Sequence, residues 1–276
     1  MAAGDILCLN GSLAPARSAA KFIGTGDEAC LIDTHAVARQ TAADTAGTYT
    51  EWINIPDITG TYGIVSCGDT AAIEFISLRV EAGKITVECN DATVDQFEHT
   101  TTNVVITPHK WHHIALVQDA TLNAPKIYVD GDLITEMTAT LETDNAAWFG
   151  QCQLIDDGSI GASEEAGAAG QIDEMIGAIS DVKYWNTNLS ATEVLRDYQG
   201  ATPANINSNL TDWWKMEDLT NEVTAANPIV KGASILFVKA YSEFTSKVAH
   251  SGVIVADDIS ISTNDQLGTC FVVKAA

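Results

Sequence analysis

Carboxylates are densest in residues 156–174, DDGSIGASEEAGAAGQIDE. Calcium binds through about six to eight oxygen atoms, and carboxylates are among its preferred ligands. The candidate calcium ligands are Asp156, Asp157, Glu164, Glu165 and Asp173, with Asp69 as an additional candidate from an earlier part of the chain. The alternative, which we favour, is a hydrated acidic loop without a metal, because runs of acidic residues are usually solvated. The small residues between the carboxylates have little to bury, which predicts a loop or flexible edge in either case.

Two adjacent histidines stand in KWHHIALVQD, residues 110–119. Successive side chains of a strand point to opposite faces of a sheet, so His112 and His113 diverge if this segment is extended. They then cannot easily chelate one metal ion together. Further along, Asp130-Gly131 supplies the positive φ angles of a tight hairpin turn. The stretch therefore predicts a hairpin in which one of the two histidines is a half-buried strand residue.

Aromatic side chains are candidates for sugar binding, because a ring can stack on the apolar face of a sugar while carboxylates and amides hold its hydroxyls. Trp148 and Phe149 lie just before the acidic segment and are the candidate glycan-binding residues. The alternative, which we favour, is that NAAWFGQCQLI is another core strand. The same two interpretations, a glycan-binding ring or a core residue, apply to Tyr49, Tyr62 and Trp213.

The chain has no GxSxG elbow, HExxH helix, P-loop or dinucleotide-binding fingerprint, and its six histidines have no spacing that requires a site. The common nucleophile, zinc and phosphate signatures are therefore unsupported. Six cysteines are present without CxxC or CxxH spacing, which disfavours a zinc cluster. Most are expected to be buried thiols, although Cys67 and Cys89 lie in neighbouring predicted strands and can approach one another.

Composition indicates a globular protein with a substantial core. Of 276 residues, 46% are hydrophobic and 18% charged, and no apolar run approaches the roughly 18 residues that cross a bilayer. Thirty-seven acidic against 14 basic residues give a net charge of -23, which repels nucleic-acid phosphate and anionic lipid. The opening MAAGDILCLNGSLAPARS lacks the basic and apolar regions of a secretory signal, so no export signal is expected.

The elements that must position these residues are mostly strands. Short runs rich in β-branched and aromatic residues recur between turn signals, which is typical of an all-β sandwich or barrel. One helical turn is predicted in LSATEVLRDYQG, where Ser190 can cap, Glu193 follows three residues later and Gly200 ends the helix. Three further strand-like runs follow residue 218. They seldom bury enough to stand alone, so we expect this tail to dock on the sandwich, a sister subunit or a host assembly.

Several segments resemble, in order, the motifs of laminin-G-like domains of the concanavalin A-like superfamily. They are AAKFIGTGDEACLI (19–32), TYTEWINIPD, the Trp-His strand KWHHIALVQD, the hairpin KIYVDGDLI, the pentraxin-type closing strand and helix GAISDVKYWNTNLSATEV (177–194), and DWWKMED (212–218). The resemblance implies a jelly-roll sandwich of two antiparallel sheets over residues 18–218. It also implies that Trp111 packs in the core and that its neighbouring histidine is structural.

The chain departs from the patterns of the proteins it resembles in three features. The pentraxin-type disulfide is absent, since Ile114 and Ala115 stand where the second cysteine belongs. The resemblance to pentraxin-type proteins implies Glu164, Glu165 and Asp173 as calcium ligands, although the loop that carries them is shorter in this chain.

Glycoside hydrolases of the superfamily carry an E-x-D-x-E pattern that brings two carboxylates about 5 Å apart. In QIDEM, residues 171–175, glutamine and methionine replace the glutamates, so we predict that the protein is not an enzyme.

The favoured interpretation is a non-enzymatic virion surface protein, either decorating a capsid or forming part of a fibre or tail. Laminin-G-like modules commonly act outside cells, yet no export signal is expected, and MAAGD resembles the start of many tailed-phage structural proteins. The domain prediction is an N-terminal arm (1–17), the sandwich (18–218) and a C-terminal β extension for docking or oligomerisation (219–276).

The predicted partners are other virion proteins and further copies of the chain, with a cell-surface glycan as an additional ligand. Nucleic acid and membrane insertion are not expected. No cofactor is required and calcium is optional. The predicted location is the virion surface after synthesis in the host cytoplasm, or alternatively the extracellular space. The alternatives are a free carbohydrate-binding or adhesion module, with or without calcium, and a glycoside hydrolase relative.

Overall fold

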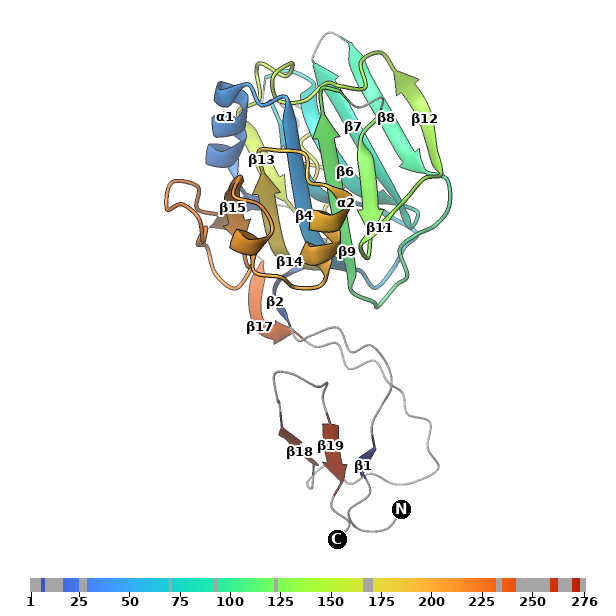
Figure 1. Cartoon of the computed structure of the whole chain (residues 1–276), viewed down its shortest axis with the longest axis vertical. Helices are drawn as coiled ribbons and strands as arrows, with labels where there is room; N and C mark the ends of the chain where they lie inside the picture. Colours follow the sequence, from blue (N-terminus) through green and yellow to red (C-terminus); the bar gives the residue numbers. More distant parts are fainter. Residues whose placement is uncertain are drawn as a thin grey trace. The chain divides into compact units, whose positions relative to one another are not determined.

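The structure is a computed structural model, which describes residues 6–7, 17–24, 29–69, 71–91, 94–121, 124–165, 171–231, 235–241, 259–262 and 270–273. The chain divides into two compact units. One comprises residues 18–241 and forms a sandwich of two sheets, shown face to face in Figure 1. The other combines residues 1–17 with residues 242–276. In the described part, no helix is long and apolar enough to span a membrane.

The first sheet, called the β4 sheet, follows the order β11-β10-β9-β4-β14-β2-β17, with β15 paired to β14. Its strands are β2 (Arg17–Ile23), β4 (Ala46–Asn54), β9 (His112–Asp119), β10 (Lys126–Val129), β11 (Asp132–Leu133), β14 (Ile176–Trp185), β15 (Leu210–Trp214) and β17 (Leu236–Tyr241). Its central strand, β4, pairs antiparallel with both β9 and β14.

The second sheet, called the β6 sheet, follows the order β12-β8-β7-β6-β5-β13-β3-β16. Its strands are β3 (Cys30–Leu31), β5 (Thr61–Gly68), β6 (Glu74–Glu81), β7 (Lys84–Asp91), β8 (Asp95–Thr101), β12 (Met137–Glu142), β13 (Asp157–Ile160) and β16 (Val230–Lys231). Consecutive strands β5 to β8 form an antiparallel meander. The predicted all-β architecture of two antiparallel sheets is thereby confirmed.

The core lies between the two sheets because alternate residues of each strand are apolar. On β4, Tyr49 and Ile53 join this core, while Thr50 and Trp52 face the opposite side. A second, smaller cluster covers the outer face of the β4 sheet, where Trp185 packs with Leu189 and other apolar residues. The β4 sheet is therefore buried on both faces near its centre, which explains why nearly every residue of β4 is buried.

The predicted turn at Asp130-Gly131 is confirmed. Both residues have positive φ, 53° and 86°, and the turn joins β10 to β11. The adjacent histidines diverge as expected from strand geometry. His112 Nδ1 lies 3.0 Å from Asp130 Oδ2, whereas His113 Nε2 lies 3.1 Å from Asp197 Oδ2 on the outer face of the sheet. Each side chain has its own partner, and both are buried, so the prediction that one of them is half-buried is wrong.

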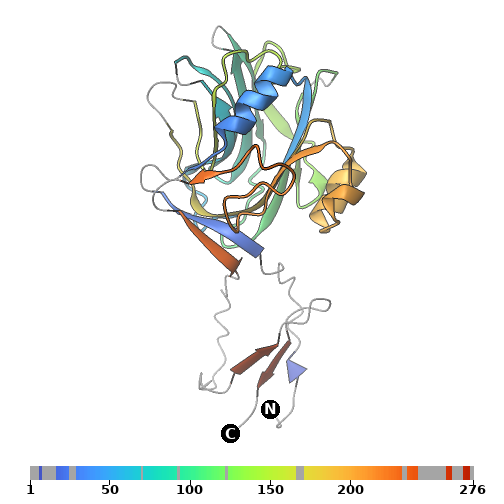
Figure 2. The ribbon, with the colours of Figure 1, turned by 90° about the vertical axis from the view of Figure 1, so that its left-hand side faces the viewer.

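The predicted helix is α2 (Ala191–Tyr198), and its predicted cap is confirmed. The Ser190 side chain accepts from the Glu193 backbone amide while the Glu193 carboxylate accepts from the Ser190 amide, which satisfies two otherwise unpaired donors. A short 3-10 helix, η2 (Pro203–Asn205), follows it. The α2 helix covers the outer face of the β4 sheet, and Figure 2 shows it separate from the α1 helix (Asp33–Ala42).

The sequence does not predict α1 (Asp33–Ala42), because this helix lacks the usual signals. Its N-cap, Ile32, makes no side-chain cap hydrogen bond, and its C-cap, Ala43, adopts a left-handed conformation that usually selects glycine. The only residues of α1 that are fully buried are His35 and Ala36, so its apolar face is narrow. Tertiary contacts with β13 hold this helix in place.

The chain beyond residue 218 is divided between the two units. Residues 219–241 belong to the sandwich unit, where β16 pairs with β3 and β17 lies beside β2. In the other unit, β1 (Ile6–Leu7), β18 (Ile259–Ser262) and β19 (Cys270–Val273) form a three-stranded sheet of order β1-β19-β18. The start and the end of the chain thus pair with each other through β1 and β19.

Candidate functional site

A surface hollow of about 220 Å³ lies where β14, β15 and the segment after α2 meet. It is lined by Asp181 and Lys183 of β14, Trp213 of β15, Asp197 of α2 and residues 200–203. We call it the Trp213 pocket. It brings an aromatic ring, two carboxylates and an ammonium group to one opening.

Strand alternation decides which of two adjacent tryptophans reaches this pocket. Trp214 points into the core, where it is fully buried and its Nε1 donates to the Asn227 carbonyl at 3.0 Å. Trp213 therefore points to the outer face and is half-buried. Directly opposite it on β14 stands Lys183.

An irregularity in β14 shapes the pocket. The pairing of β14 with β4 shifts between Ser180 and Lys183, and Asp181 within this bulge has a φ of 56°. Bulges re-aim side chains, and here the Asp181 carboxylate sits between two donors. Its Oδ1 accepts from Trp213 Nε1 at 2.7 Å and its Oδ2 accepts from Lys183 Nζ at 2.6 Å.

Lys183 and Asp197 form a buried ion pair in the wall of the pocket, and both side chains are charged. Lys183 Nζ lies 3.1 Å from Asp197 Oδ1, and Asp197 Oδ2 accepts from Thr50 Oγ1 at 2.7 Å. Burial by itself would raise the pKa of Asp197, but the Lys183 ammonium and the contact with His113 outweigh it and hold the pKa well below its usual range. Burial opposes the charged form of Lys183, yet Asp197 and Asp181 raise its pKa. The two carboxylates and one ammonium of the wall leave one net negative charge.

Two lysines hold the ring of Trp213. The Nζ atom of Lys215 lies 4.8 Å from the ring centroid and that of Lys183 lies 5.9 Å from it. Ammonium groups within about 6 Å of an indole ring are attracted by its π electrons. Together with the hydrogen bond to Asp181, these contacts fix the ring in a set orientation before any ligand arrives.

The predicted calcium ligands fall into two groups with different neighbours. Asp157 and Glu164 face Asp33, and burial followed by these charges raises the pKa of Asp157 to about 6. Glu165 and Asp173 instead lie near Arg79. Among the residues that the structure describes, no three histidines, cysteines or carboxylates are arranged to hold a metal ion.

The remaining candidates already have other roles or stay exposed. Asp69 Oδ1 accepts from the backbone amide of Ala71 at 2.5 Å in a turn. Glu164 Oε1 accepts from Gln171 Nε2 at 2.8 Å, and Asp156 lies exposed at the surface. Asp69 and Glu164 thus make separate local hydrogen bonds, but, in addition to burial, the charges of Asp69, Asp156 and Glu164 all help to raise the pKa of Asp157.

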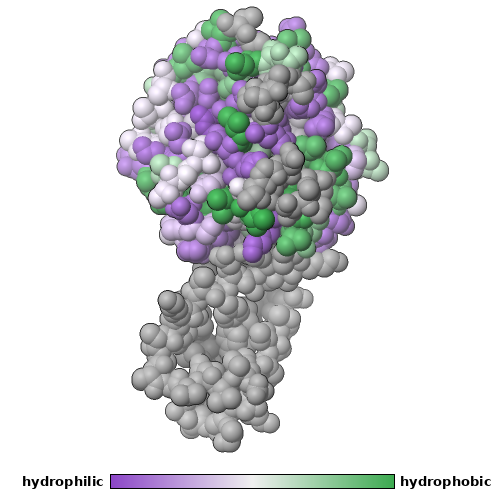
Figure 3. Space-filling view, turned by 180° about the vertical axis from the view of Figure 1, so that it is seen from behind, coloured by the Kyte–Doolittle hydropathy of each residue, from purple (hydrophilic) through white to green (hydrophobic). Residues whose placement is uncertain are grey.

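Arg79 of β6 explains the position of Glu165. Its guanidinium Nη1 lies 2.8 Å from Glu165 Oε1, and its Nη2 lies 2.8 Å from Glu88 Oε2 and 3.6 Å from Glu98 Oε1. One guanidinium thus contacts three neighbouring carboxylates on the outer face of the β6 sheet and offsets only one of their three negative charges. Figure 3 shows hydrophilic side chains gathered over this side of the sandwich.

The predicted glycan-binding residues Trp148 and Phe149 are 0% and 1% exposed. Trp148 Nε1 donates to the hydroxyl of Tyr184 at 3.3 Å. The rings of Trp148 and Phe149 pack edge to face with their centroids 5.3 Å apart. Neither ring presents a face to a ligand at the surface. They form part of the core, as the alternative interpretation expects, although they lie in turns rather than in a strand.

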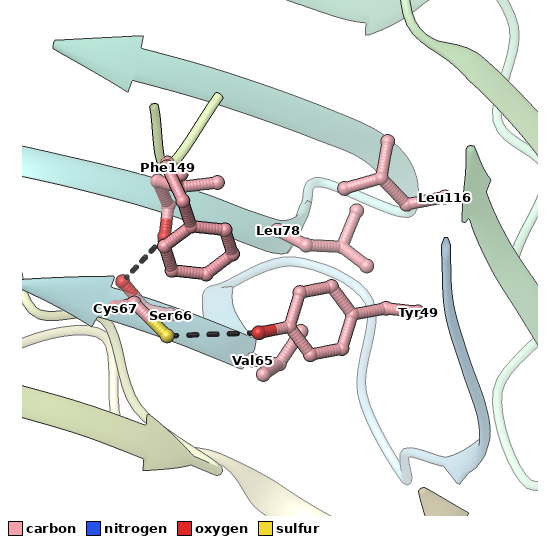
Figure 4. Close-up of a pocket in the computed structure, with 8 residues that line it drawn as sticks. Tyr49, Val65, Ser66, Cys67, Leu78, Leu116 and Phe149 are labelled. Carbon is pink, nitrogen blue, oxygen red and sulfur yellow. Dashed lines mark hydrogen bonds between the residues drawn. The ribbon is translucent and has the colours of Figure 1, made fainter. Parts of the chain in front are cut away.

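A buried chain of polar groups resembles an acid-base relay. His35 Nδ1 lies 2.9 Å from Asp212 Oδ2, His35 Nε2 lies 2.7 Å from the Tyr49 hydroxyl, and that hydroxyl lies 3.7 Å from Cys67 Sγ. Figure 4 shows the last contact beside a cavity of about 10 Å³, which has room for at most about one water molecule. Burial raises the pKa of Cys67 to about 12, so its thiol stays protonated. The relay is therefore structural.

The sequence contains no local signal for this relay, since His35 and Asp212 are 177 positions apart. For the Trp213 pocket there is a partial signal. Two adjacent tryptophans on one strand must face opposite sides of a sheet, so one of them points away from the core. Which of the two does so, and what surrounds it, depends on the packing of β15 against β14.

The geometry defines a sandwich of two antiparallel sheets with an aromatic, carboxylate-lined pocket on the outer face of the β4 sheet. The family model described as the concanavalin A-like lectin/glucanases superfamily matches residues 25–195, and the chain belongs to this family. No curated protein matches the chain at a significant level.

Solved structures share the fold at low identity. A putative carbohydrate binding protein from Bacteroides ovatus is 15% identical with a TM-score of 0.53, covering 82% of this chain and 60% of that protein. The CBM40 module of a Ruminococcus gnavus IT-sialidase, bound to α2,3 sialyllactose, is 15% identical with a TM-score of 0.54, covering 68% of this chain and 100% of the module. A mutant of NanB sialidase from Streptococcus pneumoniae is 14% identical with a TM-score of 0.53. The match covers 66% of this chain and 28% of the sialidase. The chain thus spans about three fifths of the Bacteroides protein.

Proposed function

We propose that this chain is a non-enzymatic, lectin-like binding protein and that its Trp213 pocket holds one ring of a neutral glycan. The observation that carries this proposal is the half-buried Trp213 ring, oriented by Asp181 and two lysines at the mouth of an open hollow. The non-enzymatic role is supported by Gln171 and Met175, which stand where glycoside hydrolases of this fold need glutamates.

The pocket has the chemistry that sugar recognition requires. An indole face packs on the C–H groups of a pyranose ring, while carboxylates and hydroxyls at the rim bind its hydroxyl groups. Asp181 keeps 22% of its side chain exposed, and Thr202 adds an exposed hydroxyl to the lining. Pockets that bind drug-sized ligands measure roughly 300–1,000 Å³. A hollow of about 220 Å³ therefore suits a single ring rather than a long chain.

Electrostatics favours a neutral sugar over an acidic one. In the described lining the ammonium of Lys183 is paired with Asp181 and Asp197, and the ammonium of Lys215 beside the Trp213 ring is paired with Glu222 at 2.9 Å. The protein as a whole carries a net charge of -23, which repels anionic ligands. The pocket is therefore expected to discriminate against sialylated glycans, unlike the sialyllactose-bound relative.

Substitution of Trp213 by alanine tests the proposal. A screen of the full chain against a glycan array first identifies a ligand, and calorimetry then measures the dissociation constant. Loss of the stacking surface is expected to weaken binding at least about tenfold. Trp213→Phe keeps an aromatic face and is expected to keep part of the affinity.

The controls separate binding from folding. Lys126→Ala changes an exposed residue outside the pocket and should bind as the wild type does. Thermal unfolding shows whether each variant is folded. A folded Trp213→Ala protein with unchanged affinity, or a clear preference of the wild type for sialylated glycans, would rule out this site or its proposed ligand class.

A virion surface role is the second candidate, and the terminal unit favours it. In that unit β1 pairs with β19, and β1 and β18 are the outermost described strands of its sheet. A small sheet with outer edges can accept a strand from a partner, and three short strands seldom suffice alone. We expect the full chain to form symmetric oligomers or to decorate particles in electron micrographs. A monomer in sedimentation experiments that is absent from particles would contradict this role.

A further inference from the structure

Two buried thiols face one another inside the sandwich. Cys89 of β7 and Cys152, which follows the turn at Trp148, have their Sγ atoms 3.5 Å apart. Both side chains are completely buried in the main core. Cys152 Sγ also lies 3.6 Å from the backbone carbonyl of Asn90, which neighbours Cys89. The connection between β12 and β13 is thus held against the middle of the β6 sheet at this point.

We propose that Cys89 and Cys152 form a disulfide bond when the protein folds under oxidising conditions. The two sulfur atoms are already in van der Waals contact, so bond formation requires them to approach by about 1.5 Å. The bond would join β7 to the segment between β12 and β13, and would close a loop of roughly 60 residues.

The register of the sheet disfavours the pairing of Cys67 with Cys89 that neighbouring predicted strands suggest. Cys67 of β5 lies opposite Ile76 of β6, and Ile76 lies opposite Cys89 of β7. An intervening strand therefore separates the two cysteines, which places their Cα atoms about 10 Å apart. Disulfides require a Cα separation below about 7 Å. Cys152 reaches Cys89 because it approaches from the core and not along the sheet.

The chemistry balances with a small disulfide such as oxidised glutathione as the oxidant. The thiolate of one cysteine attacks a glutathione sulfur and releases one glutathione as thiolate, which gives a mixed disulfide. The second thiolate attacks the protein sulfur of that mixed disulfide, forms the bond between the cysteines and releases the second glutathione. The two protons lost by the protein are taken up by the two glutathione thiolates.

Folding is the step at which this exchange is expected. The hydrogen bond with Cys152, together with burial, raises the pKa of Cys89 well above its usual value. The native thiol is therefore a poor nucleophile, and its side chain is completely buried. A chain that is still folding exposes both thiols, and completed packing then protects the bond from reduction.

Peptide mapping of the refolded full chain tests the proposal directly. The protein is unfolded in denaturant with reductant, then refolded in mixed reduced and oxidised glutathione, alkylated and digested with trypsin. Cleavage after Lys and Arg places Cys67, Cys89 and Cys152 in three different peptides, residues 40–79, 85–110 and 127–183. We expect peptide 85–110 to be joined to peptide 127–183, with a mass about 2 Da below the sum of the two.

Stability supplies an independent readout. Closure of a loop of this length is expected to raise the Tm by on the order of 10 °C relative to the reduced protein. Cys67→Ala, the matched control, should keep both the cross-link and the Tm difference, and Cys152→Ala should lose both. Recovery of every cysteine as an alkylated thiol, a cross-link between another pair, or an oxidised protein with no higher Tm would overturn the proposal. Peptide mapping of the wild type decides the question even if a variant fails to fold.

Discussion

Replacement of Asp212 by alanine is expected to lower the free energy of unfolding by about 3–5 kcal/mol. The Asp212 carboxylate is buried, and its Oδ2 lies 2.9 Å from His35 Nδ1. Its Oδ1 accepts from the side-chain amides of Asn221 at 2.7 Å and Asn227 at 2.5 Å. Alanine would leave all of these buried groups without an acceptor. The shift of the denaturant midpoint, measured at constant m-value, reports the loss.

Asp212→Ala should also change how the free energy of unfolding depends on pH under acidic conditions. Burial would raise the pKa of Asp212, but the contact with His35 and the amide hydrogen bonds hold it well below its usual range. A carboxyl with a lowered folded pKa stabilises the protein above its unfolded pKa of about 3.9, and this contribution is lost as pH falls through the folded value. The Asp212→Ala protein should therefore lose less stability than the wild type between about pH 4 and pH 2.

Asp212→Asn is the matched control for the charge. It retains an acceptor oxygen for the two asparagine side chains but has no ionisable group, so we expect a smaller loss of stability together with the flattened acid profile. An alanine variant within about 1 kcal/mol of the wild type would show that the relay does not hold the sandwich together.

Replacement of Glu51 by methionine is expected to have the opposite effect, a gain of about 1–3 kcal/mol at neutral pH. Glu51 of β4 is completely buried, and neither of its carboxylate oxygens has a hydrogen-bond partner in the part of the chain that the structure describes. Burial, followed by the charge of Asp197, raises the pKa of Glu51 well above its usual value. Methionine has a similar length and removes the unsatisfied group from the core.

The pH dependence separates charge from packing. A carboxyl with a raised folded pKa favours folding below its unfolded pKa of about 4.3, and that advantage is lost as pH rises through the folded value. The gain from Glu51→Met should therefore grow from about pH 4 upward. Glu51→Gln removes the titration but keeps a polar group, so it should flatten the profile with little gain in acid. Equal stability of the methionine and wild-type proteins at pH 5 and pH 8 would refute this account.

The sequence predicts the fold well because its strand signals are local. Alternating apolar residues, the Asp130-Gly131 turn and the capping box of Ser190 with Glu193 each act over a few residues. The family motifs occur in a fixed order, which indicates the two-sheet sandwich that the structure confirms. The sequence does not predict the α1 helix, because this helix lacks local capping signals and is held in place by contacts with β13.

The candidate sites are harder to predict because they depend on which residues meet across the fold. The carboxylates at residues 156–174 are neighbours in sequence, yet Glu165 faces Arg79 while Asp157 faces Asp33. Trp148 and Phe149 look available beside an acidic loop, but turns direct both rings into the core. A hydrophobic ring at a loop has the same sequence signature whether it faces solvent or protein.

By itself, the amino-acid sequence determines the sandwich, the opposite directions of His112 and His113, and the acidic charge that disfavours anionic partners. Only the tertiary structure decides that Trp213 meets Asp181 at an open pocket and that Cys89 meets Cys152. Strand periodicity sets the face to which a side chain points over two residues. Contacts between side chains dozens of positions apart depend on register and on bulges such as that in β14, which have no local signature.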